Sequence, residues 1–240
     1  MSSRDAPDRP CYEPAWRRPI AGGFRRSADF AVRWCVRRGV HPNTVSWMSL
    51  VSASAAGACF LGARQWPLLL LLAPLFCWLR LWFNMLDGMV ALASKKASRT
   101  GEIVNELPDR ISDVVILVSA GYSGWCDPAG GYWAAIFALL TAYVGTLGQA
   151  IGVQREFRGV MSKPWRMVAI GAGAWLALLV AVVDGAPAGA ISLLRGDSFT
   201  VSRFGGLTIL DWTMIVIVAG CVQTVIVRLA RIVRAVRAKD

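Results

Sequence analysis

The sequence predicts an all-α membrane protein with six transmembrane helices and both termini cytoplasmic, preceded by a basic amphipathic interfacial helix. Of its 240 residues, 55% are hydrophobic and only 17% are charged, and its mean hydropathy is +0.48. These values lie outside the usual range for soluble domains. Six stretches approach the roughly 20 mostly apolar residues that a bilayer helix needs, and the short alternating strands of a membrane barrel are absent from the sequence.

The distribution of charge along the chain indicates contact with a lipid bilayer. A formal net charge of +11 could indicate nucleic-acid binding. The basic residues, however, cluster beside the apolar stretches, where they set orientation and contact anionic headgroups. No nucleic-acid recognition motif accompanies them, and the six scattered cysteines contain no C-x-x-C pair. We therefore expect no nucleic-acid partner, disulfide framework or zinc site.

The N-terminal region divides into two parts. Residues 1–23 are polar, and a disordered tail is expected. In residues 24–40, aromatic residues such as Phe30 and Trp34 alternate with arginines at helical spacing. This pattern predicts an amphipathic helix on the cytoplasmic membrane surface; the alternative is a basic juxtamembrane tail that only sets orientation. A turn follows, and Asn43 or Thr44 is expected to cap the next helix.

The membrane domain is predicted over residues 41–232, with a basic cytoplasmic tail at 233–240. The expected spans are residues 45–62, 68–93, 101–121, 132–151, 167–183 and 209–227. Segments assigned to the cytoplasm contain nine, three, four and five Lys or Arg residues, whereas the outer loops contain one, none and two. This asymmetry predicts that both termini lie inside.

Polar residues at the cytoplasmic ends of the second and third spans form the candidate site. Helical periodicity places Asn84, Asp87, Gly88 and Ala91 on one face of the second span; the two small residues leave room for a backbone or a flat ligand. On the third span, Asp109 follows Asn105 by four residues. Asp87 and Asp109 are expected to converge, and carboxylate and amide oxygens suit Mg²⁺ held together with substrate phosphates.

These residues resemble the motif of the CDP-alcohol phosphotransferase family, D-x2-D-G-x2-A-R-x8-G-x3-D-x3-D. Here it reads N-x2-D-G-x2-A-L-x8-G-x3-N-x3-D from Asn84 to Asp109, with every spacing kept. Asn84, Leu92 and Asn105 replace Asp, Arg and Asp. The Pro42-Asn43 entry to the first span and the six-helix length are also similar to the family, so the resemblance covers most of the chain.

The resemblance implies transfer of a phosphatidyl group from a CDP-linked lipid, such as CDP-diacylglycerol, to a polar alcohol. CMP is released, and the reaction belongs to phospholipid biosynthesis. It also implies one or two Mg²⁺ or Mn²⁺ ions, a bacterial inner membrane with the active site facing the cytoplasm, and a homodimer, which is common in the family. Asp109 is the expected catalytic base. The implied metal ligands are Asn84, Asp87, Asn105 and Asp109, and the implied CDP-binding residues are Asn84, Gly88, Ala91 and Gly101.

The departures from the motif weaken the metal site, because an Asn oxygen coordinates without contributing negative charge. Further carboxylates on the third span are expected to support it: Glu102, Glu106 and Asp113. Arg80 lies one turn before Asn84 and deeper in the membrane, as does Asp113. We expect Arg80 and Asp113 to form an ion pair, since each buried charge then loses part of its cost.

The loop after the fourth span supplies cations beside this site. Its G-x-M-x-K-P-x-R-M pattern resembles the corresponding loop of bacterial family members, and its charges can bind a phosphate or the acceptor. The candidates are Arg155, Arg158, Lys163 and Arg166. The alternative is that these residues only enforce topology.

Two other functions remain open from the sequence. A catalytically inactive family member would keep the fold and act as a CDP-lipid-binding or assembly subunit, a role that the degenerate motif allows. A transporter would also place polar residues inside a helical bundle, but the sequence lacks paired inverted repeats.

Overall fold

A computed structural model describes residues 25–94, 99–153, 156–184, 201 and 203–238; the side chains of residues 25–29 and 99–105 are outside this description. The predictions for the tail at 1–23 and for Arg155 therefore fall outside it, as do those for the side chains of Glu102 and Asn105. The described elements are α1 (Arg25–Arg37), α2 (Pro42–Gly62), α3 (Leu69–Ala93), α4 (Arg99–Gly121), α5 (Pro128–Ala150), α6 (Lys163–Asp184), β1 (Arg203–Phe204), β2 (Leu207–Thr208) and α8 (Ile209–Arg237).

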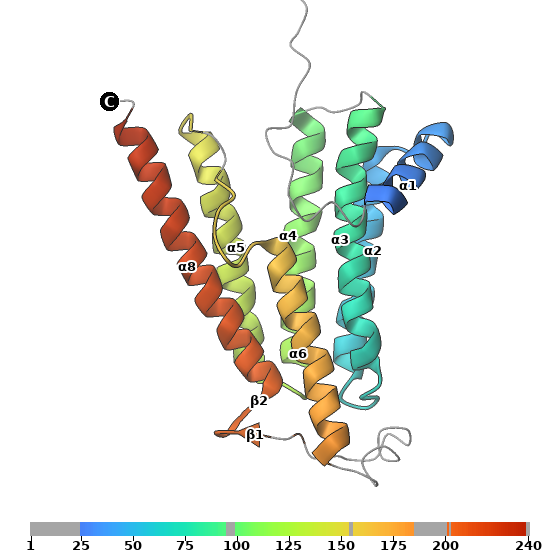
Figure 1. The fold of residues 1–240 in the computed structure, drawn as a ribbon, viewed down its shortest axis with the longest axis vertical. Helices are drawn as coiled ribbons and strands as arrows, with labels where there is room; N and C mark the ends of the chain where they lie inside the picture. The colour runs from blue at the N-terminus through green and yellow to red at the C-terminus, as the bar shows by residue number, and fades with distance from the viewer. Residues whose placement is uncertain (1–24, 95–98, 154–155, 185–200, 202, 239–240) are drawn as a thin grey trace, which may run out of the picture.

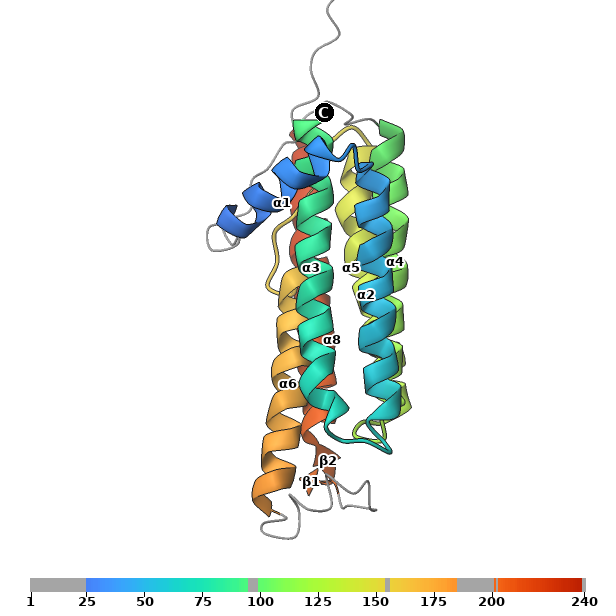
Figure 2. The same cartoon turned by 90° about the vertical axis from the view of Figure 1, so that its right-hand side faces the viewer.

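Six long helices form a closed ring. Helix α2 packs against α3 and α4, α4 against α5, α5 against α8, α8 against α6, and α6 against α3. The helices run lengthwise, with α1 crossing one end (Figures 1 and 2). At that end α5 and α8 tilt away from α3 and α4, and α6 begins well below the end of α3 (Figure 1). The N-terminus of α6 therefore lies within the length of the bundle.

The predicted spans correspond to these helices. Five of the described helices are long and apolar enough to cross a membrane: α2, α3, α5, α6 and α8. Helix α4 has 23 residues but carries the charged residues of the candidate site. The all-α membrane architecture is thus confirmed, whereas the sixth crossing and the orientation of the termini stay predictions. Residues 233–237, placed in the basic tail by sequence, continue α8.

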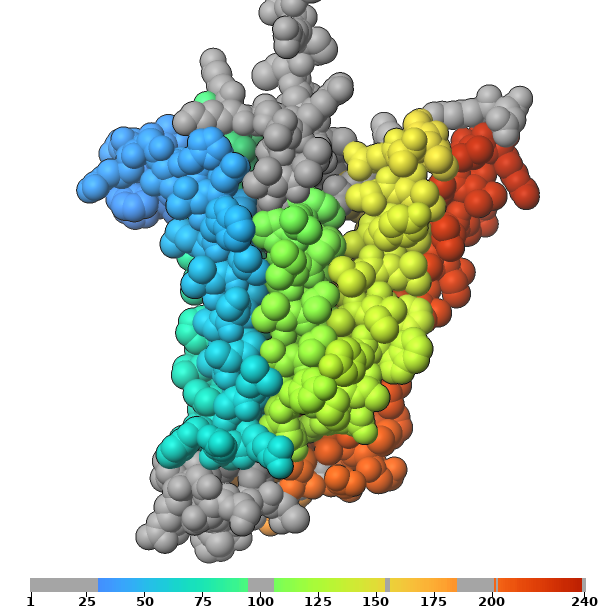
Figure 3. Space-filling model, turned by 180° about the vertical axis from the view of Figure 1, so that it is seen from behind, coloured from blue at the N-terminus to red at the C-terminus, as the bar shows by residue number. Residues whose placement is uncertain are grey.

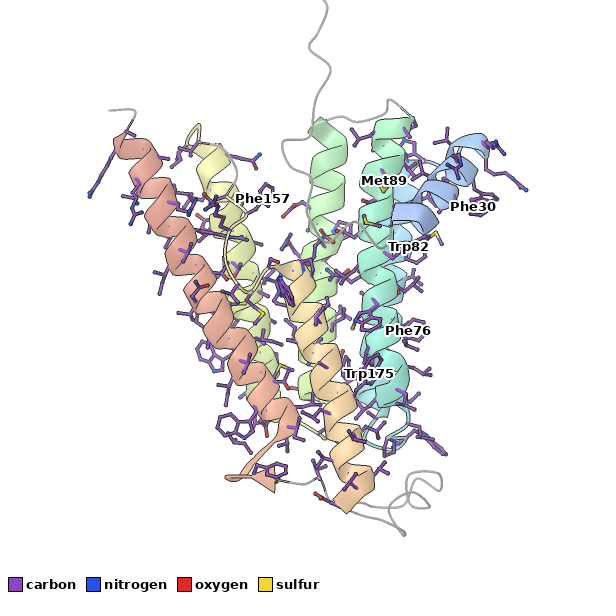
Figure 4. All side chains as sticks on the ribbon, viewed as in Figure 1. Phe30, Phe76, Trp82, Met89, Phe157 and Trp175 are labelled. Atoms are coloured by element: carbon purple, nitrogen blue, oxygen red, sulfur yellow. The ribbon has the colours of Figure 1, made fainter. Side chains whose placement is uncertain are left out.

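Helix α1 has one buried face. Val32 and Cys35 are buried in a small cluster with residues of α2 and α3, and Trp82 and Met89 of α3 pack against it. Phe30 is exposed and projects from the other side of α1 (Figure 4). Burial raises the pKa of the Cys35 thiol. An exposed aromatic residue on a basic helix suits a membrane surface.

The start of α2 corrects the predicted cap. Pro42 occupies the first turn, and His41 is the N-cap, its Nδ1 accepting from the Asn43 backbone N–H at 3.3 Å. Asn43 and Thr44 are therefore not the cap. Proline has no N–H to satisfy in the first helical turn, so the helix begins earlier than the apolar pattern suggests.

Small residues bring the helices close together. A Cβ at Gly131 of α5 would lie 2.7 Å from the Leu117 carbonyl oxygen of α4, and one at Gly173 of α6 would lie 2.3 Å from Thr213 Oγ1 of α8. Helices in lipid associate through such close packing. Figure 3 shows α2, α4 and α5 side by side on one face, and Figure 4 shows Trp175 of α6, whose Nε1 donates to the Leu71 carbonyl of α3 at 3.3 Å.

At the end opposite α1, a capping network joins three segments of the chain; it consists of Trp125, Asp127, Thr208 and Asp211. Thr208 and Asp211 form a capping box at the start of α8. Asp211 Oδ1 accepts from the Asp127 backbone N–H at 2.7 Å, and Thr208 Oγ1 donates to the Trp125 carbonyl at 2.7 Å. Trp125 Nε1 donates to the Ala63 carbonyl at 3.1 Å. This network fixes where α5 and α8 begin.

Candidate functional site

The charged site lies where α3, α4 and the start of α6 meet; it consists of Arg80, Asn84, Asp87, Asp109, Asp113, Lys163 and Arg166. Arg80, Asn84 and Asp87 follow each other at steps of four and three along α3, so they share one face. Arg80 is fully buried, and Asp87 is 2% exposed. Charged side chains at this depth require partners.

Asp87 is held by α2. Ser46 Oγ donates to Asp87 Oδ2 at 2.8 Å. The other carboxylate oxygen, Oδ1, is buried and lacks a hydrogen-bond partner among the described residues. Burying such an oxygen costs free energy unless a cation or a hydrogen-bond donor contacts it. Asp87 Oδ1 is therefore a candidate ligand atom for a cation.

Gly88 and Ala91 lie beside Asp87 on the same helix. Gly88 is exposed, and a Cβ built there would meet nothing within 4 Å. This agrees with the predicted space beside Asp87. No backbone among the described residues occupies that space. Ala91 is half-buried. Gly101 lies in α4, outside the described side chains.

Asn84, Asp109 and Lys163 form a three-way contact. Asn84 Nδ2 donates to Asp109 Oδ1 at 2.7 Å. Lys163 Nζ donates to Asn84 Oδ1 at 2.5 Å and also pairs with Asp109 Oδ2. Both oxygens of Asp109 and the oxygen of Asn84 therefore already accept from a neighbour.

A second cluster lies around Asp113. Arg80 Nη2 is 2.8 Å from Asp113 Oδ1, which brings together the pair expected from the sequence. Arg166 Nη2 donates to Asp113 Oδ2 at 2.6 Å, and Arg166 Nη1 donates to the Met161 carbonyl at 3.1 Å. Arg80 Nη2 also donates to the Asp109 carbonyl at 3.0 Å. One carboxylate thus receives two buried guanidinium groups, which leaves it little freedom to bind a metal.

The loop cations divide by location. Lys163 and Arg166 turn into the charged site. Arg158 is exposed, and its backbone carbonyl accepts from Arg228 Nε at 2.9 Å. Of the three loop cations that the structure describes, Lys163 contacts the motif residues Asn84 and Asp109, and Arg166 contacts Asp113, whereas Arg158 is exposed.

Glu106 takes a different position from Asp109. Its carboxylate pairs with Arg110 at 2.8 Å. Both side chains line a cavity of about 290 Å³ between α4 and α5, together with Tyr143 and Thr146. Arg110 Nη1 lies 3.8 Å from Asp113 Oδ2. Glu106 therefore connects with the charged site through Arg110.

Sequence reasoning missed the serines of α2. Ser46 holds Asp87, Ser49 Oγ donates to the Arg80 carbonyl at 3.2 Å, and Ser52 Oγ donates to the Phe76 carbonyl at 3.0 Å. Their spacing of three residues was the available signal, because it puts all three on one helical face. They attach α2 to the face of α3 that carries the motif.

The donor set fits one divalent cation better than two. Hard cations take carboxylate and amide oxygens, and Asp87 Oδ1 is such an oxygen without a partner. The oxygens of Asn84 and Asp109 contact Lys163 instead. Within the described residues, no group of three or more His, Cys, Asp or Glu side chains surrounds a common point.

Comparison with known proteins places the fold. No family model matches the chain. It is 28% identical over 138 residues to the inner membrane protein YnbA of Escherichia coli (strain K12), an alignment that covers 58% of this chain and 68% of YnbA. Among solved structures, it resembles Mycobacterium tuberculosis phosphatidylinositol phosphate synthase with CDP-DAG bound, with a TM-score of 0.64, 18% identity, and 86% and 94% of the two chains covered.

A second structure of that synthase, in complex with manganese and citrate, gives a TM-score of 0.63 at 18% identity, with 85% and 88% of the two chains covered. Its apo form gives 0.60 at 18% identity, with 83% and 93% covered. The chain therefore shares its fold with this synthase. CDP-DAG, manganese and citrate are ligands in the synthase structures.

Proposed function

We propose that this chain is a bacterial inner-membrane phosphotransferase. It transfers a phosphatidyl group from a CDP-linked lipid such as CDP-diacylglycerol to an alcohol and releases CMP, in phospholipid biosynthesis. The observation that carries the proposal is the buried Asp87 with a partnerless oxygen, in a fold shared with a synthase that binds CDP-DAG. The likeness to YnbA supports the location.

In this proposal, Asp87 Oδ1 is the ligand of a divalent cation, Mg²⁺ or Mn²⁺. Bound there, the cation supplies charge neutralisation at the donor pyrophosphate. The exposed Gly88 leaves space beside it for the nucleotide. Asn84, Ala91 and Gly101 complete the proposed CDP-binding residues, with Asn105 as an additional metal ligand.

Asp109 receives the proton of the acceptor hydroxyl. Its Oδ2 is held by Lys163 and its Oδ1 by Asn84, so the carboxylate is fixed in orientation. Each carboxylate oxygen has a second lone pair that can take a proton. As the hydroxyl oxygen bonds to the phosphorus, the bond from phosphorus to the CMP oxygen breaks, and CMP leaves. Positioning and charge neutralisation supply most of the catalysis in such transfers.

Lys163 and Arg166 are the proposed contacts for phosphate or acceptor, and Arg155 and Arg158 are further candidates from the same loop. The concentration of Lys and Arg in the loops at this end supports a cytoplasmic orientation of the site. Small residues on the helix surfaces are compatible with a homodimer, which molar-mass measurement in detergent tests separately.

A second candidate function is supported by the same contacts. Because Lys163 and Asn84 engage both oxygens of Asp109, the chain could hold a CDP-lipid without turning it over. It would then be an inactive binding or assembly subunit of this fold.

The experiment is a CMP-release assay on the full chain with CDP-diacylglycerol, Mn²⁺ or Mg²⁺, and a panel of polar alcohols. We expect CMP with at least one alcohol, and a loss of about 100-fold or more in Asp87→Asn and Asp109→Asn, the size typical of removing a catalytic group. The matched control is Asp127→Asn in the capping network, which should keep wild-type turnover. CDP-lipid binding without CMP from any alcohol would establish the second candidate instead.

A further inference from the structure

We propose that the ammonium group of Lys163 is a built-in cation that replaces one of two divalent metal ions, so that the charged site binds a single divalent ion at Asp87. The inference rests on the proposed function only for the chemical role of that ion. The contacts that carry it belong to this chain alone.

The position of Lys163 is that of a bridging cation. Its Nζ contacts oxygens from two different helices, Asn84 Oδ1 on α3 and Asp109 Oδ2 on α4. Its side chain is only 10% exposed. A metal ion bridging the two helices would use these same oxygens, and the ammonium group already occupies that bridging position.

Residues before and after Lys163 in the sequence are anchored to other helices. Lys163 is the first residue of α6, where a cation is unfavourable beside the positive end of the helix dipole unless it is paired. Three residues later, Arg166 is anchored to Asp113 and to the Met161 carbonyl. The Met161 backbone N–H donates to Thr224 Oγ1 of α8 at 3.0 Å.

Gly159 lets the loop make this approach. Its φ is +128°, and a Cβ there would lie 2.2 Å from Thr224 Cγ2. Only glycine adopts such a backbone conformation readily at so close an approach. The lysine is therefore placed by a fixed loop, unlike a surface cation that reaches the site by chance.

Asn84 can hydrogen-bond to both Lys163 and Asp109, which a carboxylate at this position could not do. Its amide nitrogen donates to Asp109 Oδ1 while its oxygen accepts from Lys163. An aspartate at this position would have no donor for Asp109 and would place two like charges side by side. With asparagine, the Asp109 carboxylate keeps its pairing with Lys163 and also lies 3.6 Å from Arg80 Nη2, so its negative charge is already compensated. A divalent ion added there would meet the positive charge of Lys163.

Asp87 lies outside the group formed by Asn84, Asp109 and Lys163. Its Oδ2 accepts from Ser46, and its buried Oδ1 lacks a partner among the residues described. A single divalent ion at Asp87 therefore satisfies the remaining oxygen without competing with Lys163.

The test is Mn²⁺ binding to the full-length protein in detergent, by free-Mn²⁺ titration and electron paramagnetic resonance. Wild type should bind about one Mn²⁺ per chain and give the spectrum of an isolated ion, whereas a two-metal site would give a coupled pair. The double variant Asn84→Asp/Lys163→Met should gain a second ion and a coupled spectrum. Lys163→Arg, which keeps the positive charge, is the matched control and should stay at about one ion.

Several results would overturn the proposal. They are a coupled Mn²⁺ pair in wild type, no Mn²⁺ binding in wild type, or a folded double variant that binds no more Mn²⁺ than wild type. The wild-type spectrum decides the matter alone if the double variant fails to fold, which size-exclusion chromatography would reveal. CMP release is a separate readout: one bound ion without turnover removes the proposed reaction and leaves the assignment of Lys163 intact.

Discussion

In the capping network, both carboxylate oxygens of Asp211 accept from neighbours: Oδ1 from the Asp127 backbone N–H at 2.7 Å and Oδ2 from the Thr208 backbone N–H at 2.9 Å. In the charged site, Asp87 Oδ1 and the Nε atoms of Arg80 and Arg166 are buried without a hydrogen-bond partner among the described residues. Both groups lie in the same bundle. Buried polar atoms in native proteins are usually satisfied, so the unpartnered atoms distinguish the charged site, our proposed ligand site, from the capping network, where both oxygens of Asp211 are paired.

Removing Asp113 should have the largest effect. Asp113→Ala leaves the buried Arg80 and Arg166 without their shared carboxylate, which we expect to lower the free energy of unfolding by about 3–5 kcal/mol. Asp211→Ala in the capping network removes the acceptor of two backbone N–H groups and of the Thr208 hydroxyl, which can still donate to the Trp125 carbonyl, and should cost about 1–2 kcal/mol. Thermal unfolding of both variants in one detergent measures the contrast; an equal loss would mean that the two networks do not differ as described.

An intermediate effect is expected at Gly159. Gly159→Ala places a methyl group against Thr224 at a φ of +128°, and the strain should cost about 1–3 kcal/mol. The control is Gly205→Ala, which also has a positive φ, +60°, but no neighbouring atom within 4 Å of its Cβ. Its cost should be on the order of 1 kcal/mol.

The Gly159 variant also tests how the loop positions Lys163. We expect Gly159→Ala to weaken the restriction to one bound Mn²⁺ ion per chain and to lower CMP release. Gly205→Ala should keep both properties at the wild-type level. Stability loss without any change in either property would show that this loop contributes to folding alone.

The smallest effect is expected in the capping network itself. Thr208→Val removes the N-cap of α8 and should lower the free energy of unfolding by about 1 kcal/mol. CMP release at a temperature where the variant stays folded should be unchanged. The control is Thr146→Val. Among the bonds described, Thr146 Oγ1 donates only within its own helix, to the carbonyls of Tyr143 at 2.9 Å and Ala142 at 3.5 Å, so this change should alter stability by less than about 0.5 kcal/mol. A drop in turnover in Thr208→Val would contradict the separation of the two networks.

Much of the bundle follows from local pattern. The second span, expected at residues 68–93, is α3 at Leu69–Ala93, because a long apolar run between Trp66-Pro67 and a basic loop leaves little freedom. The proximity of Arg80 and Asp113 also follows from sequence, since two opposite charges at one membrane depth on adjacent helices find each other.

The central contact of the charged site depends on tertiary packing. From the sequence, Lys163 was one of four equivalent loop cations. In the structure Lys163 and Arg166 turn inward, and Gly159 packs closely against Thr224 in the loop before them. Ser46 was likewise one serine among several in a span rich in small residues. The helices are thus predictable from periodicity, whereas the ligand positions require the packing of segments distant in sequence.

The most direct test of the charged site as a cation site anchored by Asp87 is the shift of Tm that Mn²⁺ produces. A ligand that binds only the folded state stabilises it by about 2.7 kcal/mol at 100 times its Kd. We expect Mn²⁺ to raise the Tm of wild type and of Thr208→Val by the same amount, and to leave the Tm of Asp87→Asn unchanged. An equal rise in Asp87→Asn, or no rise in wild type, would contradict the account.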